Sequence, residues 1–461
     1  QAEDGIRDVE RSRGLGDVYK RQVILFYNFL RIVRKIPSSL CIRCKGFKNL
    51  CGLGECPILK IYRSRFQTYS KLSSKYVDGS TPPSLLVGEY GYPKVRVMLN
   101  LPPGVYSWNA EIYDSPLRWW GKYNLEDIIK LRSSLLSNVI KVDIKDVWRL
   151  YEKEISISSV SFNPVDVESR LSKTPQPSLR FDDIIKPIGL TAYVEDIKIT
   201  SSPRIGRVLE KRIFDDVKAS DTVIELYKSG YDIYRIINAL SSGLLGRLRD
   251  RKIVPTRWAI TAVDSILGDY FRKRLTDKPY IDNIRVFTGR YLSNRFIVIL
   301  YPGPLQIEWI EAWHPRSIWN ISSSEIAMYR LNEDYRGNYS DMDGGYMAAR
   351  LPVLEYLYKI GRQATVFIYR EISPDYYAPV GNWHIRETVK NMLSGGYRVY
   401  DDLFDAIYKE LKYFRIPVDT WIERSKLIKD IFKNRFKDLS LIHISEPTRP
   451  LYISYAVFCL K

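Results

Sequence analysis

Four cysteines fall within sixteen residues of this 461-residue chain, and their spacing constrains the fold more than any other feature. They follow the pattern Cys41-x2-Cys44-x6-Cys51-x4-Cys56, with three glycines between them. Four thiolates on short loops can converge tetrahedrally on one Zn²⁺, and glycine permits the positive backbone angles that such loops need. The spacing therefore predicts a structural zinc site, because four protein ligands leave no open coordination position for catalysis.

Two other interpretations of the cysteines stay open at this point. Two disulfides would suit a secreted chain, but the long remainder holds a single further cysteine, Cys459. An iron–sulfur cluster would use the same thiolate ligands. We favour zinc, because a bound metal can contribute on the order of 10 kcal/mol of folding free energy to an irregular loop that packs few side chains.

Basic residues surround these cysteines. Arg43, Lys45, Lys48 and Lys60 lie among or directly after them, and Phe47 stands between polar neighbours. A basic zinc knuckle that carries an aromatic ring can contact phosphate groups and stack on a base. A solvated charged face without a ligand is the alternative interpretation.

Both ends of the chain look foreign to the rest. Residues 17–22 (DVYKRQ) match the translation of a common sequencing-library adapter, and residues 439–449 (LSLIHISEPTR) match its opposite strand. We therefore expect residues 1–22 and 439–461 to be adapter-derived artefacts and the native sequence to run from about residue 23 to 438. Removing them lowers the formal net charge only from +18 to +17, because together they hold seven basic and six acidic residues.

The remaining length is enough for two domains, each with its own core. A content of 45% hydrophobic and 27% charged residues is typical of a folded globular protein. The longest apolar stretch, Val23–Leu30, is far shorter than the ~20 residues that a membrane-spanning helix needs. We expect no membrane span and a cytoplasmic protein.

Helical and strand periodicities are mixed along the chain without regular βαβ alternation, which predicts an α+β fold with two domains and mixed or antiparallel sheets. Asn124 is the expected N-cap of a helix that reaches Leu136. Residues 281–313 hold three strand candidates in succession, which predicts an antiparallel meander. Further strands are predicted at 85–101, 155–162, 188–200 and 364–372. Further helices are predicted at 208–251 with breaks at 230 and 243, 258–275, 345–359, 385–393, 401–414 and 420–436, and a loop-rich stretch is predicted from 314 to 344.

A net charge of +18 predicts attraction to polyanions. One cluster of basic residues has Trp258 and Tyr270 between its members, and basic groups beside aromatic rings suit a groove that follows a nucleic-acid backbone. Its members are Arg247, Arg249, Arg251, Lys252, Arg257, Arg272, Lys273 and Arg274. A charged helix end beside a core tryptophan is the alternative interpretation.

The segment SSPRIGR, residues 201–207, adds Arg204 and Arg207 as candidate phosphate contacts. Its backbone N–H groups could contribute to the same contact. The segment is a weak fingerprint, because it lacks the lysine and the spacing of a nucleotide-binding P-loop.

Candidates for catalysis lie in and after the predicted meander, where carboxylates and histidines could hold Mg²⁺ or act as acid and base in a nuclease. Glu308 and Glu311 have opposite parity, so a regular strand would point them to different faces, which argues against a simple paired site. Asp341 and Asp343 begin a sequence like a calcium loop, but Pro352 stands where a glutamate is expected, so an Asx turn is favoured. The full set is Glu308, Glu311, His314, Asp334, Asp341, Asp343, Arg370, Glu371 and His384.

Six segments carry a resemblance to known proteins. They are CIRCKGFKNLCGLGECPIL (41–59), LPPGVYSWNAEIYDSPLRWW (101–120), SSPRIGR (201–207), VPTRWAITAVDSILGD (254–269), DGGYMAARLPVLEYL (343–357) and REISPDYYAPVGNWHIRE (370–387). On these segments the chain resembles the archaeal Nre family of DNA-repair proteins. The resemblance implies an N-terminal domain over 23–315, a C-terminal domain over 316–438, a role in DNA-damage repair and the sliding clamp as a partner. The family reaches the clamp through a glutamine-led motif at the extreme C-terminus, and this sequence holds no convincing copy of it.

The leading hypothesis is a DNA-binding repair factor that carries a structural zinc ion and has no defined catalytic residue. A metal-dependent nuclease that uses the carboxylates between Glu308 and Asp343 is the first alternative. An RNA- or ribosome-associated zinc protein is the second, because the composition suits RNA equally well.

Overall fold

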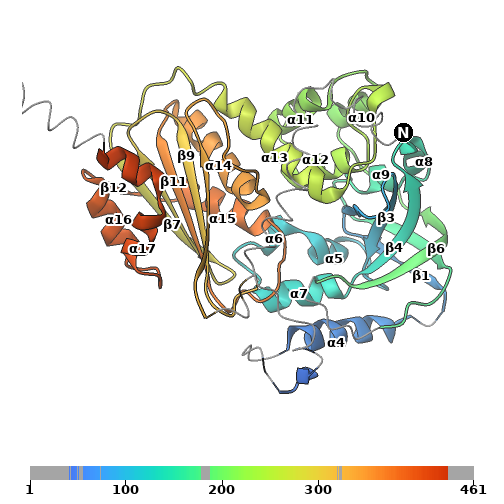
Figure 1. Ribbon diagram of the computed structural model, residues 1–461. Helices are drawn as coiled ribbons and strands as arrows, with labels where there is room; N and C mark the ends of the chain where they lie inside the picture. Colours follow the sequence, from blue (N-terminus) through green and yellow to red (C-terminus); the bar gives the residue numbers. More distant parts are fainter. Residues whose placement is uncertain are drawn as a thin grey trace, which may run out of the picture.

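A computed structural model describes residues 41, 43–48, 50, 56–72, 74–177, 187–318, 320 and 324–433 of the chain. The predicted helical stretch at Val23–Leu30, Cys51 and the two expected artefacts at 1–22 and 439–461 lie outside these residues. The described part is α+β, as predicted, and contains two six-stranded sheets with helices packed on them (Figure 1).

The first sheet has the strand order β1-β5-β6-β4-β3-β2. Its neighbouring strands are antiparallel except β4 and β6, which run parallel. Alternate residues of β5 are buried, as period-two side-chain orientation requires. The strands are β1 (Tyr76–Thr81), β2 (Leu85–Val87), β3 (Lys94–Leu101), β4 (Leu136–Asp143), β5 (Val165–Leu171) and β6 (Leu190–Ile199).

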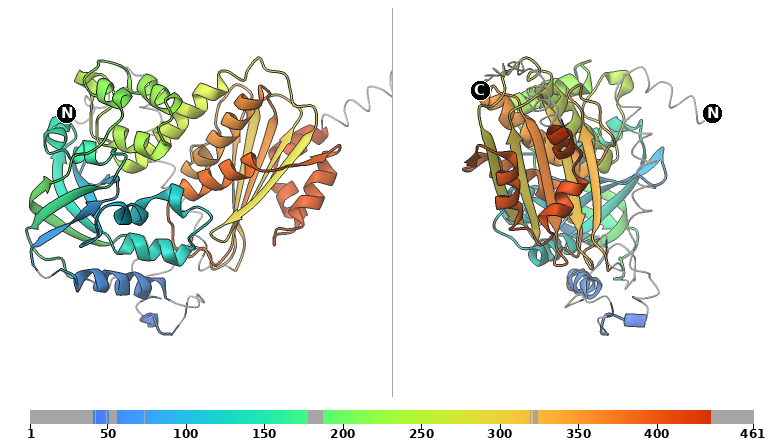
Figure 2. Two further views of the ribbon diagram at one scale, coloured as in Figure 1. Left: turned by 180° about the vertical axis from the view of Figure 1, so that it is seen from behind. Right: turned by 60° about the vertical axis from the view of Figure 1, so that its left-hand side comes forward.

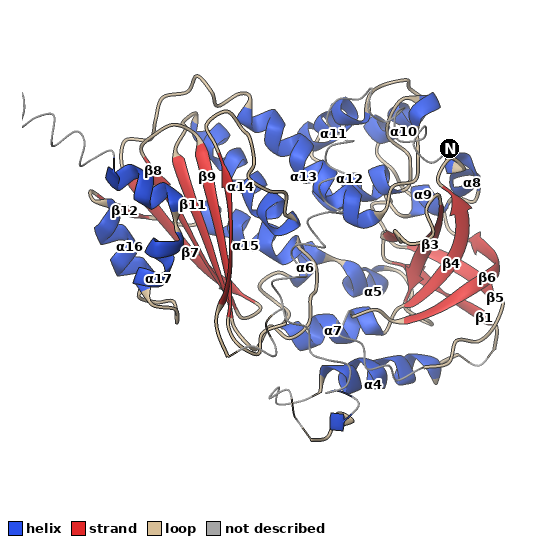
Figure 3. Ribbon diagram, viewed as in Figure 1, coloured by secondary structure: helices blue, strands red, loops and turns tan. Residues whose placement is uncertain are grey.

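Short helices surround this sheet (Figure 3). They are α4 (Pro57–Tyr69), α5 (Trp108–Glu111), η1 (Ile112–Asp114), α6 (Pro116–Trp119), α7 (Leu125–Ser133), α8 (Val147–Glu152) and α9 (Ile155–Ser158). Asn124 caps α7 as predicted: its side chain accepts from the Asp127 N–H, and the Asp127 side chain accepts from the Asn124 N–H. The helix ends before Leu136, because that residue begins β4.

A helical layer follows in the sequence and leads from the first sheet to the second (Figure 1). Breaks lie at Gly230 and Gly243, as predicted, and both glycines have positive φ angles. The longest helix of this layer, α13, packs against α11, α12 and α14. The layer consists of α10 (Arg207–Ile213), α11 (Ala219–Lys228), α12 (Ile233–Ser241), η2 (Leu248–Asp250) and α13 (Thr256–Arg272).

The second sheet has the order β10-β9-β11-β8-β7-β12. Its strands are β7 (Ile284–Tyr291), β8 (Asn294–Tyr301), β9 (Gln306–Trp313), β10 (Ala327–Glu333), β11 (Thr365–Ile372) and β12 (Arg398–Tyr400). One face packs with α13, α14 (Gly344–Ile360) and α15 (Trp383–Ser394), and the other with α16 (Leu403–Leu411) and α17 (Val418–Arg424). Figure 2 shows α16 and α17 on the face of this sheet that points away from the first sheet.

Three local predictions were wrong. Residues 155–158 form helix α9 rather than a strand, and the Ser158 hydroxyl donates to the Glu154 carbonyl one turn earlier at 2.6 Å. The three strands at 281–313 exist, but they form no meander, because β11 lies between β8 and β9 and pairs parallel with β9. The stretch expected to be loop-rich contains β10.

The predicted domain boundary between residues 315 and 316 falls between β9 and β10, which are antiparallel neighbours in the second sheet. The second sheet therefore takes strands from both sides of that boundary. Among the described residues, no helix is both long enough and apolar enough to cross a membrane.

Candidate functional site

The cysteine segment reverses direction directly after Cys44. Cys41 and Cys44 lie in a short helical stretch, and the Lys45 N–H donates to the Cys41 carbonyl at 2.8 Å. Lys45 and Gly46 both have left-handed backbone angles, with φ of 50° and 75°. Glycine is therefore suited to position 46, where a Cβ atom would add backbone strain and would lie 2.6 Å from Leu59 Cδ1.

Cys56, the residue before α4, faces this turn. A Cβ atom added to Gly46 would lie 3.3 Å from the Cys56 sulfur and 2.6 Å from Leu59 Cδ1, so the turn and the start of α4 are in close contact. Cys44 is buried, and Cys41 and Cys56 pack at the edge of an apolar cluster that includes residues of α4 and α7. Thiols gathered beside a glycine turn suit Zn²⁺ as a donor set.

The fourth predicted ligand, Cys51, lies outside the described residues. Within the described part of the chain, no three His, Cys, Asp or Glu side chains form a group that could hold a metal ion. The zinc site therefore stays a prediction.

The turn after Cys44 presents basic and aromatic side chains to solvent. We call residues 43–48 the basic turn. Arg43, Lys45 and Lys48 are exposed, and Phe47 is 83% exposed, the largest value among the exposed large hydrophobic residues. Lys60 differs, because its ammonium group pairs with Glu126 of α7 at 2.6 Å.

In the basic cluster between residues 247 and 274, two arginines hydrogen-bond to backbone carbonyls and so stabilise the fold. Arg251 is buried and donates to the carbonyls of Arg212, Asp215 and Gly246 at 2.8–3.0 Å, and also to that of Ile213. Arg272 donates to the carbonyls of residues 305 and 334, and its guanidinium group lies 2.9 Å from Glu333. Neither guanidinium group is presented to a nucleic acid, so we leave both out of the interface proposed below.

The other members of that cluster lie nearer the surface. Arg247 and Lys252 are half-buried, whereas Arg249, Arg257, Lys273 and Arg274 are exposed. Arg257 lies 3.6 Å from Glu89, and the Arg274 guanidinium carbon lies 3.7 Å from the centre of the Tyr270 ring. These side chains lie in or next to η2 and α13, and their exposure leaves them available to a polyanion.

The segment 201–207 is hydrogen-bonded to residues outside it. Ser201 Oγ accepts from the Asp166 N–H at 2.8 Å, and the Arg204 N–H donates to Ser161 Oγ at 3.0 Å. The side chains of Arg204 and Arg207 are exposed. Its guanidinium groups therefore remain candidate phosphate contacts, whereas these backbone and hydroxyl groups serve the fold.

Glu308 and Glu311 point to opposite faces of the second sheet, as their parity predicted. Glu308 is fully buried against the α16–α17 side, where it accepts from the N–H groups of Lys426 and Leu427 at 2.7 and 3.2 Å. Glu371 lies on the same side and accepts from the Arg415 and Ile416 N–H groups, while His314 Nε2 lies 2.9 Å from it. Each of these two carboxylates accepts hydrogen bonds from backbone N–H groups, and the two do not form a paired site.

Glu311 belongs to a buried polar centre with Arg370 and His384 on the opposite face. Arg370 bonds to Glu311 and to Asn294, and its Nη2 lies 3.1 Å from His384 Nε2. Burial raises the pKa of Glu311 to about 7, although Arg370 opposes the rise. Burial and Arg370 together lower the pKa of His384 to about 3, so its ring is neutral and accepts from Arg370.

The aspartates after β10 cap turns and helices. Asp343 is the N-cap of α14 and accepts from the Tyr346 N–H at 2.8 Å, and burial raises its pKa. Asp341 accepts from its neighbour Met342 and from the Tyr329 hydroxyl. Asp334 accepts from the N–H groups of residues 336 and 338. A turn-forming role was favoured for Asp341 and Asp343, and these bonds are of that kind.

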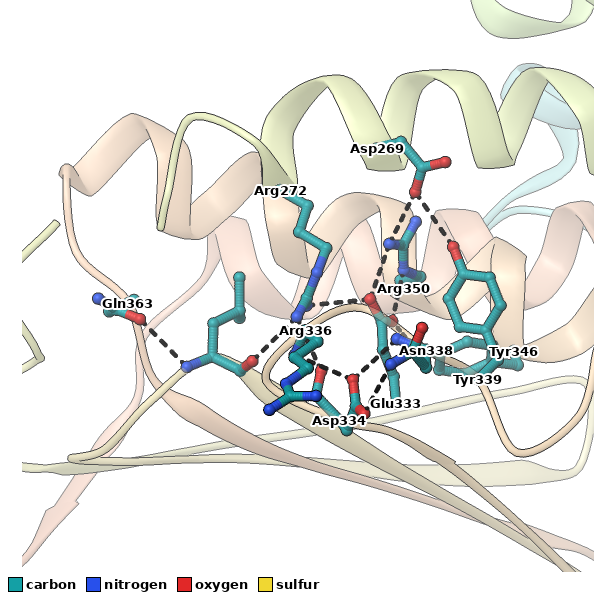
Figure 4. A network of polar contacts seen from close by, with 11 residues as sticks. Asp269, Arg272, Glu333, Asp334, Arg336, Asn338, Tyr339, Tyr346, Arg350 and Gln363 are labelled. Carbon is teal, nitrogen blue, oxygen red and sulfur yellow. Dashed lines mark hydrogen bonds and ion pairs between the residues drawn. The ribbon is translucent and has the colours of Figure 1, made fainter. Parts of the chain in front are cut away.

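Two buried arginines, each paired with carboxylates, were not predicted from the sequence. Arg386 of α15 donates to both oxygens of Asp264 of α13, and Arg350 of α14 bonds to Glu333 and Asp269 (Figure 4). Four of these residues, all except Glu333, lie in segments 254–269, 343–357 and 370–387, which carried the family resemblance. The signal available in the sequence was the presence of charged residues within these largely apolar segments.

These features define an α+β protein with a cysteine-rich N-terminal segment and buried arginine–carboxylate pairs in its core. Residues 50–320 match the family described as Archaeal Nre, N-terminal, and residues 332–439 match Archaeal Nre, C-terminal. The chain therefore belongs to the archaeal Nre family.

Relatives from two organisms are similar over most of their length. A protein named DNA repair protein NreB from Archaeoglobus fulgidus is 35% identical over 395 residues, which cover 84% of this chain and 97% of the relative. DNA repair protein NreA from the same organism is 38% identical, covering 80% and 92%. DNA repair protein NreA from Haloferax volcanii is 32% identical, covering 78% and 88%. No solved structure matches the chain.

Proposed function

We propose that this chain is a DNA-repair factor that binds DNA through the basic turn at residues 43–48. The relatives named DNA repair proteins support the repair role. The observation that carries the DNA contact is the 83% exposure of Phe47 between exposed cations. An exposed ring costs hydration free energy in the isolated protein, and stacking on a base would bury it while Arg43, Lys45 and Lys48 meet phosphates.

The proposal includes one Zn²⁺ ion held by Cys41, Cys44, Cys51 and Cys56. The close approach of Gly46 to the Cys56 sulfur supports it, because it brings the turn that follows one pair of cysteines against the last cysteine. Bound zinc would supply a rigid cross-link between the turn and α4. Phe47 and its cationic neighbours would then be held in one orientation, which lowers the entropy lost on binding.

The exposed arginines and lysines elsewhere extend the interface in this proposal. They are Arg204, Arg207, Arg247, Arg249, Lys252, Arg257, Lys273 and Arg274. Each phosphate contact releases counterions, so affinity should fall steeply with salt concentration. Binding of the sliding clamp and a cytoplasmic location stay predictions.

The test is the affinity of the whole chain for fluorescently labelled single-stranded DNA, duplex DNA and RNA, measured by anisotropy at several salt concentrations. We expect Phe47→Ala with Lys48→Glu to weaken DNA binding by roughly tenfold or more, from loss of ~1–3 kcal/mol of stacking and one phosphate contact. Tyr413→Ala with Lys412→Glu is the matched control, because it removes an exposed aromatic–lysine pair from a distant surface.

Equal weakening by the two double variants would contradict a specific role for the basic turn. Tighter binding of RNA than of DNA at every salt concentration would favour the RNA-associated alternative. Cleavage of the DNA when Mg²⁺ is added, lost in Asp341→Ala with Asp343→Ala, would favour the nuclease.

A further inference from the structure

A pocket of about 200 Å³ opens between α11, α13 and α14. Helix α13 contacts both of the other helices (Figure 1). Residues of α10–α14 form much of the apolar cluster to which the lining residues Leu267, Tyr270 and Phe271 belong. Pockets for drug-sized ligands measure ~300–1,000 Å³. This one is therefore suited to a single ring system rather than to a whole cofactor.

Four aromatic rings line the pocket. They come from Tyr227, Tyr270, Phe271 and Tyr358. The centre of the Phe271 ring lies 5.2 Å from the centres of both the Tyr270 and the Tyr358 rings, and 6.1 Å from that of Tyr227. Tyr358 is 39% exposed, whereas Tyr270 and Phe271 are buried. A planar ligand that enters would meet Tyr358 at the solvent side and rings at the floor.

Two cationic side chains contact an aromatic ring of the pocket. Lys228 lines the pocket, and its ammonium nitrogen lies 5.2 Å from the centre of the Tyr270 ring. Arg274 stacks on the same ring, and both Lys228 and Arg274 are exposed. Two carboxylates act on Tyr227: Glu355, which is paired with Lys359 at 2.8 Å, and Glu387, which is buried. Positive charge thus dominates at the rim.

We propose that this pocket accepts one unpaired nucleobase of a single strand, while Lys228 and Arg274 meet the phosphates on either side of it. The inference rests on the proposed nucleic-acid binding and names a second contact point, distinct from the basic turn. The aromatic lining favours a planar ring as the occupant, and the cations at the rim favour a ring that is part of a polyanion. Cations at the ends of α11 and α13 also complement the helix dipoles, but that role requires no pocket.

The test uses two labelled strands of abasic sugar–phosphate units, one of which carries a single 2-aminopurine base. Their charges match, so their affinity ratio for the whole chain measures what the base contributes. We expect the 2-aminopurine strand to bind at least about fivefold more tightly, and its fluorescence to be quenched on stacking. Tyr358→Ala should bring the ratio to about one, whereas Tyr358→Phe should preserve it.

Two further variants separate this pocket from the basic turn and from loss of folding. Phe47→Ala should leave the ratio unchanged if the base occupies the pocket. Lys228→Glu should weaken both strands equally, because it removes charge from an exposed position, and thermal unfolding of each variant shows whether the fold persists. Tyr335→Ala is the control for an exposed tyrosine elsewhere.

The outcomes distinguish the two proposals. A ratio that depends on Phe47 and is insensitive to Tyr358 overturns the pocket and leaves the basic turn in place. A ratio of one in the unmodified protein, with both strands bound, does the same. If neither strand binds at low salt and natural DNA does not bind either, both proposals fail. Binding of an aromatic peptide side chain in preference to the base, detected by competition, also overturns the nucleobase assignment.

Discussion

Arg350 of α14 and Glu333 of β10 form a buried ion pair with two hydrogen bonds, 2.7 Å from Nε to Oε2 and 2.9 Å from Nη2 to Oε1. Arg272 of α13 lies 2.9 Å from the same carboxylate, and Arg350 also reaches Asp269 at 2.9 Å (Figure 4). One edge strand of the second sheet is thereby tied to two helices. Asp269 lies in the segment matched by the N-terminal family, and Arg350 and Glu333 lie in the segment matched by the C-terminal family, so the Arg350–Asp269 contact joins the two segments.

Replacing Arg350 by methionine should destabilise the protein by about 3–5 kcal/mol, because it leaves the buried Glu333 carboxylate with less compensating charge. The free energy of unfolding from denaturant titration measures the effect. Arg336→Met in the exposed loop of the same network is the control and should change stability by less than about 0.5 kcal/mol. Similar effects for the two variants would show that the ion pair contributes little.

The same substitution should lower stability at Arg251 and DNA affinity at Arg249. Arg251→Met removes donors from buried carbonyls and should cost about 1–3 kcal/mol of stability. The Arg249 side chain is 78% exposed, so Arg249→Met should leave stability nearly unchanged and weaken DNA binding at low salt. Thermal unfolding and anisotropy are measured on both variants. Loss of DNA affinity in a stably folded Arg251→Met would contradict the structural role.

Stability should fall as the pH drops from about 6.5 toward 3, in part because of His384. Its pKa is lowered to about 3 in the folded protein, so in this range the unfolded chain binds a proton that the folded chain does not. The loss from this group is at most about 1.4 kcal/mol per pH unit. Glu311, whose pKa is raised to about 7, acts with the opposite sign between about pH 4.5 and 7.

Comparison with His384→Gln isolates the histidine. Unfolding free energies of the two proteins are measured between pH 4 and 8, and their difference should change below pH 6.5 and be constant above it. A constant difference over the whole range would mean that His384 titrates normally in the folded state. In NMR spectra of the folded protein, the His384 imidazole resonances should not shift with pH over this range, because the pKa of the folded state is lowered to about 3.

Purified protein should contain about one zinc ion per chain, and the metal should be lost in Cys44→Ser. Cys459→Ser is the control, since Cys459 is the one cysteine outside the predicted site. Elemental analysis gives the stoichiometry. Removing zinc with a chelator should weaken DNA binding while the two sheets stay folded, because their cores are formed by other residues. Iron in place of zinc, or paired disulfides, would contradict the zinc assignment.

Local patterns predicted the elements whose stability depends on neighbours in sequence. Asn124 and Asp127 form a capping box that the sequence indicates within four residues. Glu308 and Glu311 point to opposite faces because a strand alternates its side chains, whatever it packs against. Family resemblance marked the segments that meet in the core, although it did not indicate which residues pair.

Long-range pairing could not be predicted in the same way. Strand β11 enters between β8 and β9 after more than fifty intervening residues, and no turn signal encodes that choice. Ser156 and Ser158 are buried in α9, where the Ser158 hydroxyl donates to the Glu154 carbonyl at 2.6 Å, whereas the alternation of these serines with isoleucine suggested a strand. Strand β10 was missed because its sequence, AMYRLNE, does not alternate strictly between apolar and polar residues.

The sequence by itself determined the helical and strand periods, the spacing of four cysteines and a strongly basic charge, because each of these depends on the order of nearby residues alone. Tertiary structure decided which charges are exposed. Arg251 lies within three residues of Arg249 and carries the same group, yet one guanidinium is buried on carbonyls and the other lies in water. Solvation depends on the surfaces that folding brings together, and these come from residues far apart in the chain.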